Sequence, residues 1–167
     1  MSNSARILRV RGVALIVSNP RGEILIIQEL QTKPHLGKYT GMFSPPMETS
    51  RERERDCSTI VRLIDEELPG LAGHIKIENE RQGVYRIVPG VWVSLYVGQT
   101  RDSRLPTPDA RSKEEVGTYL WVPPCEAITF WLRQGAGEML TDYVEHRNKV
   151  VCRHCRPAIL PEASVSV

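Results

Sequence analysis

Residues 54–70 read ERDCSTIVRLIDEELPG, and the apolar residues of this stretch have helical periodicity. Side chains at i, i+3, i+4 and i+7 lie on one face of a helix, and the stretch supplies such a face with Ile60, Val61, Ile64 and Leu68. The following Pro69-Gly70 is typical of a helix end. We therefore expect one amphipathic helix of about three turns over residues 56–68.

The polar face of this helix carries a cation beside two adjacent carboxylates, Arg62, Glu66 and Glu67. Neighbouring carboxylates repel each other unless a cation neutralises them, and hard oxygen ligands suit Mg²⁺ or Mn²⁺. Periodicity alone also fits a solvated charged face, in which an Arg62–Glu66 pair contributes about 0.2–0.5 kcal/mol.

The order of charges resembles the box of the Nudix family, G-x5-E-x7-R-E-U-x-E-E-x-G-U, in which U is a bulky aliphatic residue. When the box arginine is placed on Arg62, its first glutamate falls on Glu54 and its aliphatic residue on Ile64. The paired glutamates then fall on Glu66 and Glu67.

Three positions depart from this box. Leu63 stands where the box has its second acidic residue, Glu48 stands at the opening glycine, and the closing glycine is Pro69 unless Gly70 replaces it by a one-residue slip. In addition, Ser44-Pro45-Pro46 occupies the usual Pro-Gly-Gly turn. Proline lacks the backbone freedom that glycine gives such a turn.

The resemblance implies roles for these residues. Glu66 and Glu67 are the expected ligands of Mg²⁺ or Mn²⁺, and Glu54 is a third candidate ligand that Arg62 holds by ion pairing. The family often places a further glutamate before a tryptophan-containing strand, as catalytic base or extra ligand. Glu115 is the preferred candidate for that role.

Some of these assignments have alternatives. Glu114 is the second candidate for the base, and both loop glutamates also fit plain solvated charges. Glu48 is either an added ligand or an ordinary loop carboxylate. Because Leu63 removes one carboxylate, we expect weaker divalent-ion binding or fewer bound ions.

The implied fold is an α/β, α+β-sandwich domain with a Nudix-like mixed sheet flanked by helices, over residues 6–150. The residues themselves predict a hairpin from residues 7–17 and 23–30, and further strands at 42–44, 76–80, 84–88, 91–97 and 119–122. Two closing helices are expected at 126–133 and 138–149, and a long loop at 98–113. Residues 1–5 are expected to be a disordered N-terminus, and residues 151–167 a tail containing Cys152 and Cys155.

Composition limits the possible partners. The 167 residues fit one domain, and 22 basic against 20 acidic side chains give a net charge of +2, too balanced for a polymeric nucleic-acid partner. No apolar run reaches the roughly 18–20 residues of a membrane span, and the N-terminus does not resemble a secretory signal. We therefore expect a cytoplasmic protein with reduced thiols, and the sequence is compatible with a homodimer.

The implied function is hydrolysis of a nucleoside diphosphate linked to another moiety, a pyrophosphatase-type reaction with a nucleotide derivative as partner. The alternative is a catalytically weakened or inactive Nudix-like domain that binds a nucleotide for regulation. A plain interaction module is a third hypothesis. Cys152-x2-Cys155 has zinc-type spacing that His146 or His154 could complete, but it lacks a second pair, and inert thiols at a helix end are the favoured interpretation.

Overall fold

The computed structural model describes residues 9–147. The expected disordered N-terminus, and the tail with Cys152, His154 and Cys155, lie outside the described residues.

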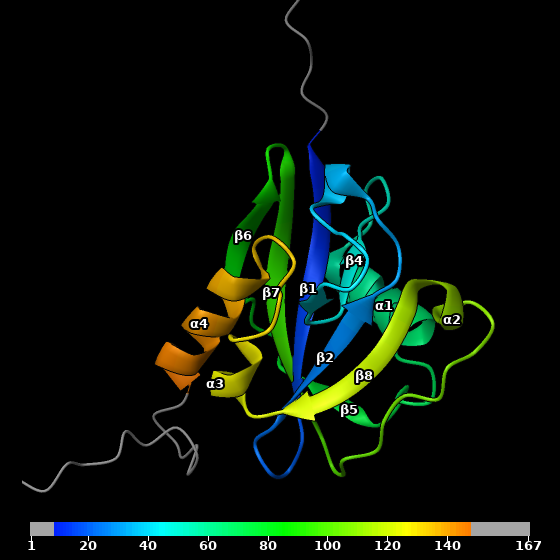
Figure 1. Ribbon diagram of the computed structural model, residues 1–167, viewed down its shortest axis with the longest axis vertical. Helices are drawn as coiled ribbons and strands as arrows, with labels where there is room; N and C mark the ends of the chain where they lie inside the picture. The colour runs from blue at the N-terminus through cyan, green and yellow to red at the C-terminus, as the bar shows by residue number, and fades with distance from the viewer. Residues whose placement is uncertain (1–8, 148–167) are drawn as a thin grey trace, which may run out of the picture.

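Within residues 9–147, eight strands form one mixed sheet, and helices pack on both of its faces (Figure 1). The strands are β1 Val10–Ser18, β2 Ile24–Glu29, β3 Phe43–Ser44, β4 Met47–Thr49, β5 Ile75–Ile77, β6 Gly83–Val88, β7 Val91–Thr100 and β8 Val116–Val122. The helices are the 3₁₀ turn η1 Pro34–Leu36, α1 Asp56–Glu67, α2 Ser112–Glu115, α3 Pro124–Ala127 and α4 Ala136–Arg147.

The centre of the sheet is the parallel pair β1 and β7, which runs in register from Val10 opposite Val91 to Ser18 opposite Gln99. The other strand pairs are antiparallel: β1 with β2 and β4, β2 with β3 and β8, and β7 with β5 and β6. The predicted hairpin is confirmed as β1 and β2. Its turn is closed by hydrogen bonds from the Asn19 amide to the Glu23 carbonyl and from the Gly22 amide to the Asn19 carbonyl.

Strand β1 divides the core into two layers because successive side chains of a strand point to opposite faces. Ala14 and Ile16 pack with α3 and α4, whereas Val13, Leu15 and Val17 pack under α1. Both faces of the sheet are therefore buried, and the predicted helix at residues 56–68 is confirmed as α1. The expectation of an α+β sandwich with a mixed sheet is confirmed.

The predicted helix at residues 126–133 is wrong beyond its first turn, since α3 ends at Ala127. The chain then pairs with β3: the Phe43 amide donates to the Trp131 carbonyl at 2.7 Å, and the Arg133 amide donates to the Phe43 carbonyl at 2.8 Å. These long-range hydrogen bonds outweigh the local helical pattern. Trp131 consequently remains 59% exposed.

Two further expectations change. The loop at residues 98–113 is shorter than predicted, because β7 continues to Thr100 and α2 begins at Ser112. Cys57 is a free, exposed thiol as expected, but Cys125 is disulfide-bonded, so the expectation of reduced thiols is wrong for it. None of the helices in residues 9–147 has the length and apolar character needed to cross a membrane.

Candidate active site

Arg62, in the middle of α1, contacts the segment that precedes the helix through Glu48, Thr49 and Glu54. Its Nε and Nη2 donate to the two carboxylate oxygens of Glu54 at 3.2 and 2.8 Å, and Nη2 also donates to the Thr49 carbonyl at 2.6 Å. Its Nη1 lies 2.9 Å from Glu48 Oε1. Arg62 and Glu54 therefore form a bidentate ion pair, as the resemblance to the box implied.

This pairing changes the titration of both partners. The hydrogen bond from Arg62, followed by one from the Arg51 amide, lowers the pKa of Glu54 to about 2. The hydrogen bond to Glu54 in turn raises the pKa of Arg62 above its ordinary value. Both oxygens of Glu54 accept hydrogen bonds, so this carboxylate ties the loop before α1 to the helix.

Glu67 is the last residue of α1, and its carboxylate is turned into the protein. The residue is 8% exposed, and among residues 9–147 its Oε2 has no hydrogen-bond partner. Burial raises the pKa of Glu67 well above its usual range, and the nearby charges of Glu29 and Glu48 raise it further. The Tyr119 hydroxyl donates to the Glu67 main-chain carbonyl at 2.7 Å and holds the helix end in place.

Glu66 lies beside Glu67 but is more exposed. Its Oε1 is 3.0 Å from Arg111 Nη1 and its Oε2 is 3.8 Å from Arg62 Nη1. Two neighbouring carboxylates, one of them buried with an unpartnered oxygen, are the donor set expected of a hard divalent cation. The residues present therefore fit Mg²⁺ or Mn²⁺.

A cavity of about 150 Å³ joins these groups to the loops. Carboxylates line it from three elements: Glu48 of β4, Glu66 and Glu67 of α1, and Glu115 of α2. Glu115 Oε1 is 3.9 Å from Lys33 Nζ. Of the two loop glutamates, the structure thus brings Glu115 to the cavity, and Glu114 is not among the lining residues.

The departures from the box have clear structural roles. Leu63 is fully buried and packs in the layer under α1 with Val13 and Leu15. The carbonyl of Pro46 accepts a hydrogen bond from the Leu15 amide at 3.0 Å. The two-proline turn therefore joins the sheet at β1.

A second group of charges at the cavity was not expected from the sequence. Lys38 and Arg133 line the cavity and are nearly buried, and both lie against Glu29, which is 3% exposed. Glu29 is the charged residue of β2, which is otherwise apolar apart from Gln28, and a charge in such a strand is a usable signal of a buried pair. Lys38 and Arg133 stand outside regular elements and carry no such signal.

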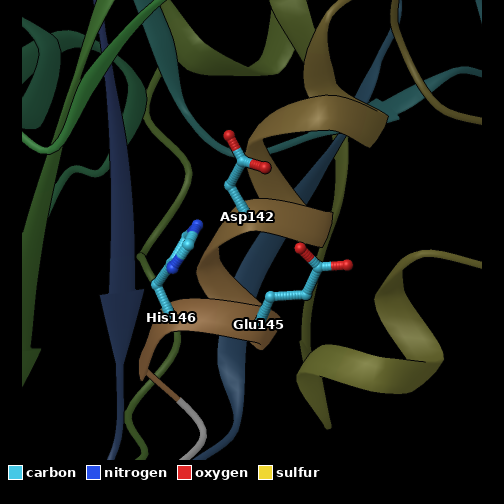
Figure 2. Close-up of side chains that lie close together, drawn as sticks. All are labelled: Asp142, Glu145 and His146. Atoms are coloured by element: carbon cyan, nitrogen blue, oxygen red, sulfur yellow. The ribbon is translucent and has the colours of Figure 1, made fainter.

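A third cluster lies on α4, where Asp142, Glu145 and His146 project from successive turns (Figure 2). Their ligand atoms lie within 4.8 Å of one another, close enough to contact one metal ion. However, Asp142 Oδ2 already accepts a hydrogen bond from the Tyr85 hydroxyl at 2.7 Å. None of the three lines the cavity at α1, and α4 packs on the opposite face of the sheet.

Comparison with solved structures identifies the class of fold. An Ap4A hydrolase of C. elegans aligns over 81% of this chain and 96% of its own, with a TM-score of 0.63 and 16% identity. RenU, a Nudix hydrolase of M. smegmatis, aligns over 85% and 86%, with a TM-score of 0.61 and 13% identity. The Nudix domain of Shewanella oneidensis NrtR, complexed with ADP-ribose, aligns over 87% and 92%, with a TM-score of 0.59 and 13% identity.

The chain therefore has the Nudix fold, as its resemblance to the box implied. No protein-family model matches the sequence, and no curated protein matches it significantly. The likeness consequently rests on the three-dimensional structure, at identities that show the fold alone.

Proposed function

We propose that this protein is a metal-dependent hydrolase of a nucleoside diphosphate linked to another moiety. The observation that carries the proposal is the buried, unpartnered Oε2 of Glu67 beside Glu66 at the wall of a cavity. Leaving a buried acceptor unpaired costs about 1–3 kcal/mol. A cation bound to Glu67 Oε2 would remove that cost, which accounts for a carboxylate in this buried position.

In this proposal Glu66 and Glu67 hold Mg²⁺ or Mn²⁺, which when bound neutralises charge on the diphosphate. Arg62 and Glu54 set the position of α1 relative to the preceding loop. Both oxygens of Glu54 are engaged by hydrogen bonds, which favours a supporting role for it over direct ligation. Glu48 reaches the cavity from β4 and is an additional candidate ligand.

Glu115 is the proposed base. It lines the same cavity as Glu66 and Glu67, and its side chain is 39% exposed, so water reaches it. A carboxylate in this place can orient a water molecule and accept its proton as the water oxygen attacks one phosphorus of the diphosphate. The P–O bond to the bridging oxygen then breaks, and the other phosphate group leaves with that oxygen. Positioning and charge stabilisation supply most of the rate enhancement in this type of reaction.

The substrate class is proposed from the expected metal ligands and from the solved structures of similar fold. One neighbour is named for its action on Ap4A and another, the NrtR domain, is complexed with ADP-ribose. In both compounds a diphosphate or longer phosphate chain is linked to a nucleoside. We infer a ligand of the same broad class here. Selectivity within it is expected to depend on residues 31–41 and 98–113, outside the box.

The test is a screen of nucleoside diphosphate derivatives with Mg²⁺ or Mn²⁺, in which phosphorus-31 NMR identifies the products. We expect turnover of at least one compound and its loss in Glu67→Gln. Asp65→Asn is the matched control, because Asp65 lies on the exposed side of the same helix turn. Absence of turnover for every compound, or undiminished turnover in Glu67→Gln, would refute the proposal.

A binding or regulatory domain is the second candidate, and the burial of Leu63 in the core favours it. An apolar residue at this position leaves α1 one carboxylate short of the family's box. In that case a nucleotide derivative would bind without metal and would remain intact, which calorimetry and NMR of the same sample would detect. Metal-dependent product formation would contradict this alternative.

A further inference from the structure

A second cavity, which we call the α4 cavity, is lined by residues of α4 and of the antiparallel strands β6 and β7 (Figure 1). Its volume is about 300 Å³, and it shares no lining residue with the cavity at α1. Cavities that hold small organic ligands begin at about this size. The α4 cavity is therefore a separate space that is large enough for a small organic molecule.

The α4 cavity is apolar on its buried side. Leu95 and Val97 of β7 line it and are only 2% and 1% exposed. Tyr143 of α4 also lines it and packs on the same core layer. A ligand that covers these side chains removes apolar surface from water, which stabilises binding in proportion to the area covered. The cavity therefore favours a ligand with an apolar body.

The polar side of the α4 cavity is built around Asp142. The Tyr85 hydroxyl donates to Asp142 Oδ2 at 2.7 Å, and this bond connects β6 with α4. Gly83 makes the bond possible, because a Cβ there would lie 2.9 Å from Tyr85 Cε2 and 3.0 Å from the Tyr85 hydroxyl oxygen. The carboxylate of Asp142 is thus held in place at the cavity wall. A group that is already oriented loses less conformational freedom when it binds a ligand.

The charges around this carboxylate are negative. Burial, the hydrogen bond to Asp142 and the negative charges of Asp142 and Glu138 raise the pKa of Tyr85. The hydroxyl therefore stays a neutral donor and leaves the charge of Asp142 in place. Glu145 adds a further carboxylate oxygen within 4.8 Å of one of Asp142 (Figure 2). An anionic ligand is repelled by these groups, whereas a cationic ligand is attracted to them.

We propose that the α4 cavity binds a small organic cation, whose ammonium group pairs with Asp142 while its apolar body lies against Leu95 and Val97. Aromatic rings attract cations near their faces, and the rings of Tyr85 and Tyr143 both belong to residues that line this space. The site is separate from the proposed hydrolase site, and the inference does not depend on the proposed function.

A metal ion fits the α4 cavity less well than an organic cation does. Glu145 is not among the residues that line the cavity, and Asp142 already uses one oxygen for the Tyr85 hydroxyl. The apolar side of the cavity also gives no stabilisation to a hydrated metal ion, whereas it contacts the body of an organic cation. Metal binding is therefore the competing outcome that the test must separate.

The test is a set of titrations of the full chain, followed by heteronuclear NMR, with phenethylammonium, hexylammonium and benzyltrimethylammonium as cations. We expect shifts of the amides of residues 82–85 and 142–146, which line or flank the cavity. Hexylammonium should bind about fivefold or more tightly than ethylammonium, because it covers more apolar surface. Phenethyl alcohol, which is neutral, and hydrocinnamate, which is anionic, should bind about tenfold or more weakly than phenethylammonium.

Variants test the role of Asp142. Asp142→Asn removes the charge but keeps an acceptor for the Tyr85 hydroxyl, and it should weaken phenethylammonium binding about tenfold or more. Glu126→Gln, at an exposed position of α3, is the control for loss of one negative charge, and Glu67→Gln is the control for the candidate active site. Both controls should bind phenethylammonium as the wild type does. Thermal melts show whether each variant folds.

Several results would overturn the inference. These are the absence of shifts with all three cations, equal affinity for ethylammonium and hexylammonium, equal affinity for hydrocinnamate and phenethylammonium, and unchanged affinity in Asp142→Asn. If Zn²⁺ shifts the same amides, no organic cation does so and Glu145→Gln abolishes the effect, the cluster in Figure 2 is a metal site and the inference falls. The hydrolase assignment stands or falls in the nucleotide screen, whose outcome does not alter these measurements.

Discussion

Replacement of Glu67 by methionine should stabilise the protein in the absence of metal. The residue is 8% exposed and its Oε2 has no hydrogen-bond partner among residues 9–147. An unpaired buried acceptor costs about 1–3 kcal/mol, and methionine fills a similar volume without that cost. At roughly 2–4 °C per kcal/mol for a chain of this size, the melting temperature should rise by about 2–12 °C.

The pH dependence of this effect has a definite sign. The pKa of Glu67 is raised in the folded protein well above its ordinary value of 4.5, chiefly by burial. The unfolded chain therefore ionises Glu67 more readily than the folded protein does, and Glu67 reduces stability increasingly as pH rises above about 4.5. The advantage of Glu67→Met should accordingly be larger at pH 8 than at pH 4.

The assay is differential scanning calorimetry in EDTA and again with Mg²⁺. Wild type should gain stability with Mg²⁺ by mass action, and Glu67→Met should not. Glu66→Gln is the control: Glu66 is paired with Arg111 at 3.0 Å, so its removal should bring no gain in EDTA. A lower melting temperature for Glu67→Met in EDTA would refute the view that Glu67 is held at a cost in stability.

The other predictions concern the supports of the site. Arg62→Lys cannot reproduce the two-pronged contact with Glu54 and should reduce the free energy of unfolding by about 1–3 kcal/mol in urea denaturation; an unchanged midpoint would contradict this role. Because the pKa of Glu54 is lowered to about 2, the stability that this pair contributes is present above pH 4.5 and is lost as pH falls towards 2, so acid titrations of wild type and Glu54→Gln should converge there. Leu63→Ala should cost about 2–5 kcal/mol, since Leu63 is fully buried, and a cost below 1 kcal/mol would contradict its assignment to the core. Gly12→Ala should lose activity and about 1–3 kcal/mol of stability, because its Cβ would lie 2.6 Å from the Glu48 carbonyl oxygen; a crystal structure with β1 and β4 unmoved would disprove this.

The sequence predicts the parts of the fold in which local pattern and tertiary packing agree. The helical spacing of Ile60 and Ile64 predicted α1, and the turn before Glu23 predicted the first hairpin. The resemblance to the Nudix box also implied the ion pair of Arg62 and Glu54, which are eight positions apart in the sequence.

Features that depend on contacts between distant segments were not predictable in this way. The parallel pairing of β1 with β7 joins segments about 80 residues apart. The helix expected at residues 126–133 failed because backbone hydrogen bonds to Phe43 compete with local propensity. Arg133 and Glu29 are separated by 104 positions, so no spacing rule could bring the two side chains together.

Binding of Mn²⁺ is the most direct test of the central claim that Glu66 and Glu67 form a divalent-metal site. Electron paramagnetic resonance reports the free ion during a titration, without any need for a substrate. Wild type and Asp65→Asn should bind Mn²⁺ alike, and Glu67→Gln should bind it about tenfold or more weakly. Equal Mn²⁺ affinity in wild type and Glu67→Gln would contradict the claim.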